Sequence, residues 1–199
     1  AAARGTRHAG WRGTDDAGTL TKYFRKVADD DKFKIRGIEA RQRSTPQFIG
    51  DVQRNCLERL EVTRSPDAVL DCLQDAIKRL HAGTVPVDQL GERNRVSKPL
   101  EGYTQNTQNM AALKEARDQD LVVHPRQDIE YVVVDDEKRS QERVVLAHEK
   151  FESYDVSYYE TQLIRALESI LSPIGWDRTE IHRELGETRV AELTAFAEH

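Results

Sequence analysis

Two helix-start signals, each followed by a stripe of apolar residues, constrain the fold of this chain more than any other feature. The segments Ser44–Pro46 and Ser65–Asp67 place a hydroxyl residue beside a proline, which suits the free backbone N–H groups at a helix N-terminus. Apolar residues then recur at intervals of three and four, as on one face of a helix. They are Ile49, Val52, Cys56 and Leu60, then Leu70, Leu73, Ile77 and Leu80. Gly83 ends the second stripe, so two antiparallel helices with a short loop are predicted.

Residues typical of β-strands lie on either side of these helices. Residues 21–27 and 33–40 flank the turn-like segment 28–32 and predict a β-hairpin ahead of the first helix. The run Ile129–Val134 is rich in β-branched residues and predicts a buried strand. A shorter strand is expected near residues 93–97. The fold class that follows is α+β and mostly helical, with a small strand element inside the helical part.

Two more helices are expected in the second half of the chain. Residues 110–117 form a short one, and residues 158–171 form a longer one that Pro173 ends. The inward face of the longer helix consists of Leu163, Leu167, Ile170 and Leu171. Residues 135–143 are charged and are expected to form a turn.

Composition excludes some classes of protein. Apolar residues make up 38% of the 199 residues, enough for a modest core, but no apolar run approaches the roughly 18 residues of a membrane-spanning helix. The N-terminus lacks an apolar signal core, so the cytoplasm is the expected location. Cys56 and Cys72 are expected to be buried thiols rather than a disulfide.

Charge is distributed unevenly along the chain. The net charge of −5 argues against a generally basic DNA-coating protein. Residues 1–62 carry 13 Lys and Arg against 9 Asp and Glu, a balance of +4, whereas the remainder carries 17 against 26, a balance of −9. The positive part could face phosphate groups, although such an imbalance is also common in chains of this size.

Six short motifs occur in a fixed order between residues 21 and 176. They are Lys22-Tyr23, Lys34–Ala40, Leu80–Pro86, Ser97–Leu100 followed by Tyr103, Ile129–Val132, and Tyr154–Gln162. In this order they resemble the end of the palm and the thumb of archaeal-type family B DNA polymerases. Some positions depart from the family pattern: Thr21 replaces a lysine, and His124–Asp128 stands where Arg-Pro-Gly-Asp is usual, which alters a glycine turn.

Composition and the resemblance together predict four parts. Composition predicts an irregular or disordered start at 1–20 and a polar C-terminal helix or tail at 177–199. The resemblance implies a palm-derived β-hairpin at 21–44 and a thumb domain at 45–176. The chain would be the C-terminal piece of a DNA-directed DNA polymerase, in which the thumb holds primer–template duplex by its backbone during DNA replication. Its expected partners are that duplex, the palm and fingers, and a sliding clamp, with no membrane.

The catalytic motifs of the family are absent from this sequence. In the family, two palm aspartates hold two metal ions that clamp the attacking and leaving oxygens, and a fingers helix holds the nucleotide. No segment here matches them. We therefore expect no catalytic residue, metal site or cofactor in this chain, and no polymerase activity from it alone. Magnesium and nucleotides would belong to the missing palm and fingers.

Candidate DNA contacts follow from motif positions and from phosphate chemistry, since Lys and Arg neutralise phosphates and Tyr donates hydrogen bonds to them. They are Lys22, Tyr23, Arg41, Arg43, Arg95, Lys98 and Tyr103. Arg43 and Lys98 match family motifs, and each candidate could also be an ordinary solvated cation or half-buried aromatic residue. Tyr154, Tyr158 and Tyr159 are expected to pack against other residues instead.

The C-terminal segment Val190–Phe196 has the spacing of a sliding-clamp peptide, with Leu193 and Phe196 as its apolar contacts. A plain amphipathic helix is the other interpretation of this segment. Two further hypotheses stay open for the whole chain. It could be a stand-alone DNA-binding or polymerase-accessory protein, or a helical protein-interaction module without a DNA role.

Overall fold

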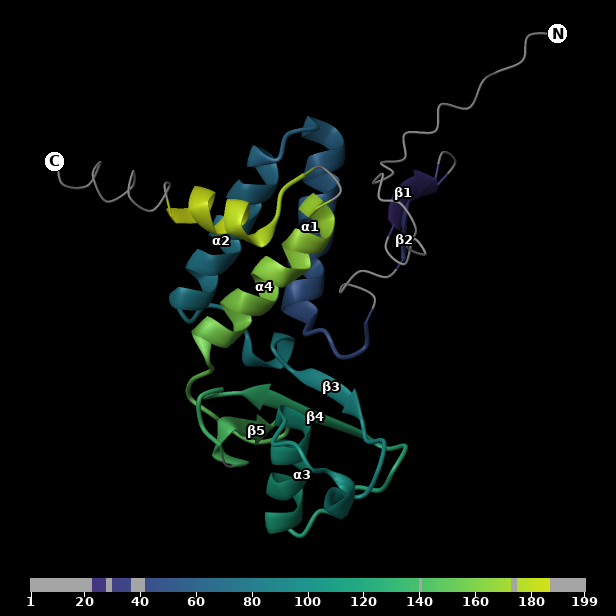
Figure 1. Ribbon diagram of the computed structural model, residues 1–199, viewed down its shortest axis with the longest axis vertical. Coiled ribbons are helices and arrows are strands. Elements are labelled where there is room, and N and C mark those ends of the chain that lie inside the picture. The colour runs from purple at the N-terminus through teal and green to yellow at the C-terminus, as the bar shows by residue number, and fades with distance from the viewer. Residues whose placement is uncertain (1–22, 28–29, 37–41, 140, 173–174, 187–199) are drawn as a thin grey trace, which may run out of the picture.

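The computed structural model in Figure 1 describes residues 23–27, 30–36, 42–139, 141–172 and 175–186. Only the backbone is described in the first two ranges, which form the strands β1 (Tyr23–Val27) and β2 (Asp30–Arg36). They pair antiparallel, as predicted, with Tyr23 opposite Arg36. The strand β2 begins inside the expected turn, because strand pairing uses backbone groups that aspartates also carry.

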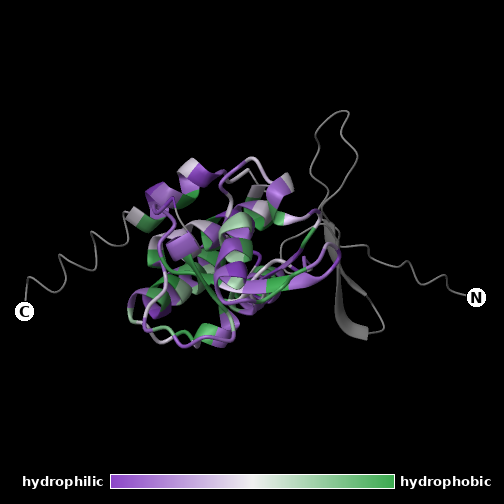
Figure 2. Cartoon of the chain, turned by 90° about the horizontal axis from the view of Figure 1, so that it is seen from below, coloured by the Kyte–Doolittle hydropathy of each residue, from purple (hydrophilic) through white to green (hydrophobic). Residues whose placement is uncertain are grey.

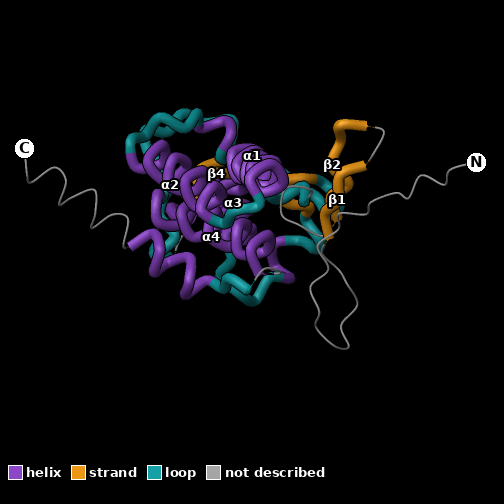
Figure 3. Tube along the Cα trace, turned by 90° about the horizontal axis from the view of Figure 1, so that it is seen from above, coloured by secondary structure: helices purple, strands orange, loops and turns teal. Residues whose placement is uncertain are grey.

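Three helices form a bundle: α1 (Gln47–Thr63), α2 (Asp67–His81) and α4 (Val156–Leu171). Each packs against the other two, and Figure 3 shows them gathered side by side. The predicted apolar stripes are confirmed, since every residue in them is at most 7% exposed. Figure 2 shows green, hydrophobic stretches where these helices meet. Burial of this apolar surface, at about 25 cal/mol per Å², is the main force that holds the bundle together.

The helix ends differ in part from the expected capping. The N-cap of α1 is Pro46, and no side chain caps this helix, because Thr45 lies one residue outside the capping position. Ahead of α2, Ser65 Oγ accepts a hydrogen bond of 3.2 Å from the N–H of Asp67. Gly83, with a φ of 64°, follows α2 and confirms the predicted stop.

A small antiparallel sheet lies at one end of the bundle, with the strand order β3-β4-β5 (Figure 1). Its strands are β3 (Glu92–Arg95), β4 (Asp128–Val133) and β5 (Val144–Leu146), and α3 (Gln108–Asp118) packs on β4 and β5. The sequence did not predict β5, because three residues carry too little pattern. Single turns of 3₁₀ helix occur at Val87–Gln89, Leu100–Gly102 and Gln141–Arg143.

Tyrosines at the start of α4 join the helices to the sheet. Tyr159 is fully buried, and its hydroxyl donates to the carbonyl of Leu90 (2.9 Å) and accepts from the N–H of Val133 (3.0 Å). Tyr154 donates to the carbonyl of Leu80 at the end of α2 (2.8 Å). These side chains pack as predicted: Tyr159 joins α4 to the sheet, and Tyr154 joins the segment before α4 to the end of α2.

After α4 the chain turns and residues 178–186 are helical, with Ile181 and Leu185 buried.

Cys56 and Cys72 are buried free thiols, as the sequence predicted. Among the helices that the structure describes, none combines the length and apolar character needed to cross a bilayer. The fold is α+β and mostly helical, which confirms the predicted class.

Candidate nucleic-acid interface

The strand β3 presents its side chains alternately to the two sides of the sheet, because successive strand residues point in opposite directions. Glu92 is buried and Asn94 half-buried, whereas Arg93 and Arg95 are exposed. The two arginines are two residues apart and therefore share one face. That face lies where the end of β3 pairs with the start of β4, Arg95 being opposite Asp128.

Arg93 and Arg95 line an open hollow of about 520 Å³ together with Arg43 and Arg126. Arg43 comes from the segment that leads into α1, and Arg126 from the turn before β4. The remaining lining residues are Val123, Gln127 and Asp128. We call this feature the arginine hollow. Four guanidinium groups and one carboxylate give it a charge of +3 on a chain whose net charge is −5.

Asp128 neutralises only one of these four arginines. Its Oδ2 lies 3.0 Å from Nε of Arg93. The side chains of Arg43, Arg95 and Arg126 are exposed and make no hydrogen bond or ion pair with any residue that the structure describes. A guanidinium group carries five N–H donors in a planar fork that matches phosphate or carboxylate oxygens. Three such groups line one hollow, which is an arrangement that suits an anion.

Lys98 and Tyr103 form a separate pair beyond the end of β3. The Lys98 Nζ lies 4.9 Å from the centre of the Tyr103 ring, at cation–π distance. The Tyr103 hydroxyl lies 3.4 Å from the backbone nitrogen of Ser97. Lys98 is exposed and Tyr103 half-buried, so the ammonium group stays open to solvent while the ring supports it. Of the predicted contacts, the structure therefore brings Arg43 and Arg95 together in the arginine hollow. Lys98 and Tyr103 do not line this hollow.

The other predicted contacts fall where the structure gives no side-chain position. Lys22, Arg41, Leu193 and Phe196 lie outside the described residues, and Tyr23 is described only as backbone, in β1. Their roles in DNA or clamp binding stay predictions.

Sequence reasoning missed two members of the arginine hollow. Arg93 could have been found from the strand expected nearby, because it shares a face with Arg95 two residues later. Arg126 follows Pro125, which is a turn signal. No sequence pattern shows that this turn lies beside the end of β3.

A second pocket, polar and about 430 Å³ in volume, has Glu92 and Asn94 in its lining. The Tyr158 hydroxyl donates to Oε1 of Glu92 (2.5 Å), and the Tyr131 hydroxyl lies 3.4 Å from Oε2. Burial raises the pKa of Glu92, and these tyrosine hydrogen bonds oppose the rise in part. The carboxyl group joins β3 to β4 and α4, which is a structural role. No part of the described chain gathers three His, Cys, Asp or Glu side chains that could hold a metal ion.

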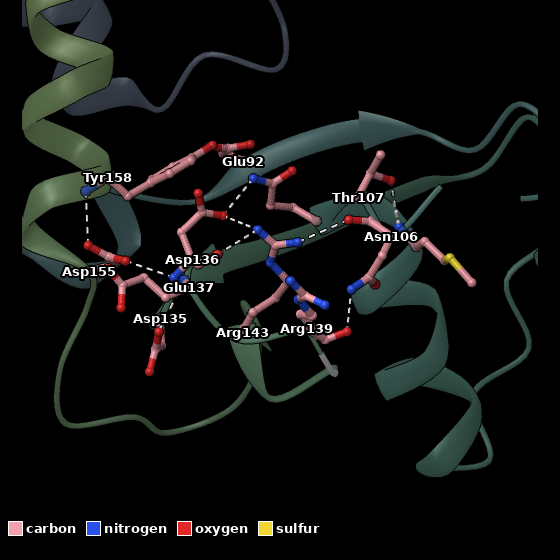
Figure 4. A network of polar contacts seen from close by, with 12 residues as sticks. Glu92, Asn106, Thr107, Asp135, Asp136, Glu137, Arg139, Arg143, Asp155 and Tyr158 are labelled. Carbon is pink, nitrogen blue, oxygen red and sulfur yellow. Dashed lines mark hydrogen bonds and ion pairs between the residues drawn. The ribbon is translucent and has the colours of Figure 1, made fainter. Parts of the chain in front are cut away.

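Arg143 is the centre of a polar network that Figure 4 shows. Its guanidinium donates to the carbonyl groups of Asn106 (3.0 Å) and Asp136 (2.8 Å) and pairs with the Asp136 carboxylate. The Asp155 carboxylate accepts from the N–H groups of Asp136 (2.7 Å) and Tyr158 (2.9 Å). Arg143 therefore holds the loop before α3 against the loop after β4, in contrast to the unpaired arginines of the hollow.

Known proteins resemble most of this chain. A family model described as DNA polymerase family B matches residues 20–174. DNA polymerase 1 of Sulfurisphaera ohwakuensis is 33% identical over 165 residues, which cover 78% of this chain and 18% of that protein. A DNA polymerase of Thermococcus aggregans is 23% identical over 164 residues, which cover 80% of this chain and 9% of that protein. The chain spans less than a fifth of the length of these relatives.

The fold is also shared with a solved structure. The family B DNA polymerase of the archaeon Pyrobaculum calidifontis matches with a TM-score of 0.63 and 22% identity, over 75% of this chain and 20% of that one. The family match covers the whole arginine hollow and every helix from α1 to α4. Because the family model matches most of the chain's length, the chain belongs to the family B DNA polymerases.

Proposed function

We propose that this chain is the C-terminal part of a DNA-directed DNA polymerase, in which it acts as the thumb and binds primer–template duplex through its phosphates. The observation that carries the proposal is the arginine hollow. Arg43, Arg95 and Arg126 place three unpaired guanidinium groups around one open space, in a family whose name states its action on DNA.

Contacts to phosphate suit a polymerase, because they fix the position of the duplex without reading its bases. Each guanidinium can donate two parallel hydrogen bonds to phosphate oxygens, and each phosphate that is neutralised releases condensed counterions. The separate pair of Lys98 and Tyr103 adds a second point of contact with the duplex. Lys22 and Tyr23 bind beside the primer strand, and Arg41 binds phosphate as well.

Other parts of the polymerase supply what this sequence lacks. The palm and fingers hold magnesium and nucleotides, so this chain alone extends no primer. A sliding clamp takes the C-terminal segment around Leu193 and Phe196. The protein works in the cytoplasm.

The first test is duplex binding measured against salt with a variant that removes both predicted arginines, Arg43→Ala with Arg95→Ala. Fluorescence anisotropy with duplexes of random sequence is measured between about 50 and 200 mM salt. We expect the double variant to bind at least about ten-fold more weakly at low salt. The slope of log affinity against log salt should fall by about 1.8, since each phosphate contact contributes about 0.9.

The matched control is Arg165→Ala, which removes one exposed arginine from α4 without touching the hollow. Its affinity and slope should equal those of the unmodified chain. A double variant with an unchanged slope, or no binding by the unmodified chain near 50 mM salt, contradicts the proposal. The second outcome would favour a helical interaction module without a DNA role.

A further inference from the structure

Arg126 occupies a backbone conformation that arginine rarely adopts. Its φ is 77°, in the left-handed region that glycine adopts freely and that L-residues other than Asn and Asp mostly avoid. The N–H of Gln127 donates to the carbonyl of His124 (3.1 Å), which closes a four-residue turn with Pro125 and Arg126 at its centre. Proline followed by a residue of positive φ is the pattern of a type II turn, where glycine is favoured at the second central position.

Backbone contacts on both sides hold this turn in place. The N–H of Arg126 donates to the carbonyl of Val96 (2.7 Å), and the N–H of Val96 donates to the carbonyl of Gln127 (2.8 Å). The Gln127 side chain also accepts from the N–H of His124 (2.7 Å). The conformation is therefore imposed by pairing at the end of β3, and a glycine at position 126 would make the same backbone bonds.

The Arg126 side chain makes no contact with the described residues that would offset this backbone strain. It is exposed and has no hydrogen bond or ion pair with the described residues. It lines the arginine hollow beside Arg43 and Arg95, and like-charged neighbours there repel it. Strained residues that the surrounding structure enforces occur preferentially at functional sites.

We propose that Arg126 is a phosphate-binding residue of the arginine hollow, retained at a left-handed turn position at the expense of fold stability. The ligand is a phosphodiester group of the duplex backbone, so the inference rests on the proposed function. The proposal predicts that one substitution at Arg126 raises the stability of the fold and weakens the binding of duplex. Arg126→Gly relieves the backbone and removes charge repulsion, and at the same time it removes one phosphate contact.

The test measures melting temperature and duplex affinity on the full chain. Arg126→Gly should raise Tm by about 1–4 °C. It should weaken duplex binding about three- to ten-fold at fixed low salt and lower the salt slope by about 0.9. Arg126→Lys keeps the charge without the planar fork, so its affinity should lie between those of Arg126→Gly and the unmodified chain, with Tm unchanged.

Arg64 supplies a matched control, because it is also exposed, follows the far end of α1 and has a φ of 57°. Arg64→Gly should raise Tm in the same way and leave duplex binding unchanged. A lower Tm for Arg126→Gly, or unchanged binding by it, overturns the inference. If Arg43→Ala with Arg95→Ala weakens binding while Arg126→Gly does not, only the inference fails; if neither weakens it, the proposed function fails as well.

Discussion

At the scale of single residues, Glu92 makes the stability of the fold depend on pH. Its side chain is buried on β3, with the tyrosine hydroxyls as its hydrogen-bond partners. Burial raises its pKa above the ordinary value of 4.5. The folded protein therefore keeps this proton to a higher pH than the unfolded chain does. Stability from this group is complete below about pH 4.5 and is lost as the pH rises through the folded pKa.

Glu92→Gln tests this dependence, because the amide has nearly the same shape and does not titrate. We expect the free energy of unfolding of the variant, relative to that of the unmodified chain, to rise as the pH increases above about 4.5. Each unit by which the folded pKa exceeds the ordinary value contributes about 1.4 kcal/mol. Urea denaturation at a series of pH values measures the difference.

The control for this measurement is Glu58→Gln, which removes an exposed carboxylate from α1. This variant measures how removal of one carboxylate by itself changes stability across the same pH range. If the difference for Glu92→Gln is constant with pH, or no larger than that of the control, the buried carboxyl group does not contribute to the pH dependence.

At the scale of elements, the sequence predicts those parts of the fold that repeat a pattern over several turns. The stripes from Ile49 to Leu60 and from Leu70 to Leu80 give α1 and α2, because three or four apolar residues define a face. The strand β5 is too short to show a pattern. The arginine hollow combines the segment before α1, the end of β3 and the turn at Arg126, and no local signal reports which distant segments the fold brings together.

The Tyr159 hydroxyl group is one of several contacts that join α4 to the sheet, and its contribution to stability can be tested. Tyr159→Phe leaves the Leu90 carbonyl and the Val133 N–H without their side-chain partner inside the protein. We expect the free energy of unfolding to fall by about 1–3 kcal/mol, the cost of leaving buried polar groups unsatisfied. Chemical denaturation measures the loss.

Tyr103→Phe is the comparison for that substitution, because the Tyr103 hydroxyl makes only long contacts of 3.4 Å near the surface. It should change stability by less than about 0.5 kcal/mol. Equal losses in the two variants would show that the Tyr159 hydroxyl is not a special joint between helix and sheet.

At the scale of the whole molecule, the proposed function meets a local charge of +3 on a chain of net charge −5. On this proposal, acidic side chains elsewhere repel the negatively charged duplex and the arginine hollow attracts it, so we expect binding to be confined to one face. A chain that holds duplex in this way and lacks the catalytic motifs should occupy a primer–template without extending it.

This combination predicts competition with an intact family B polymerase. With magnesium and nucleotides, the chain alone should give no primer extension. Added to a complete polymerase at concentrations above its own Kd for the duplex, it should slow extension by covering the primer–template. The variant Arg43→Ala with Arg95→Ala should slow it much less, because it releases the duplex. Gel analysis of extension products measures both effects. Extension by the chain alone would contradict the assignment of catalysis to the palm and fingers. If the unmodified chain and the double variant slow extension equally, the inhibition does not depend on the arginine hollow.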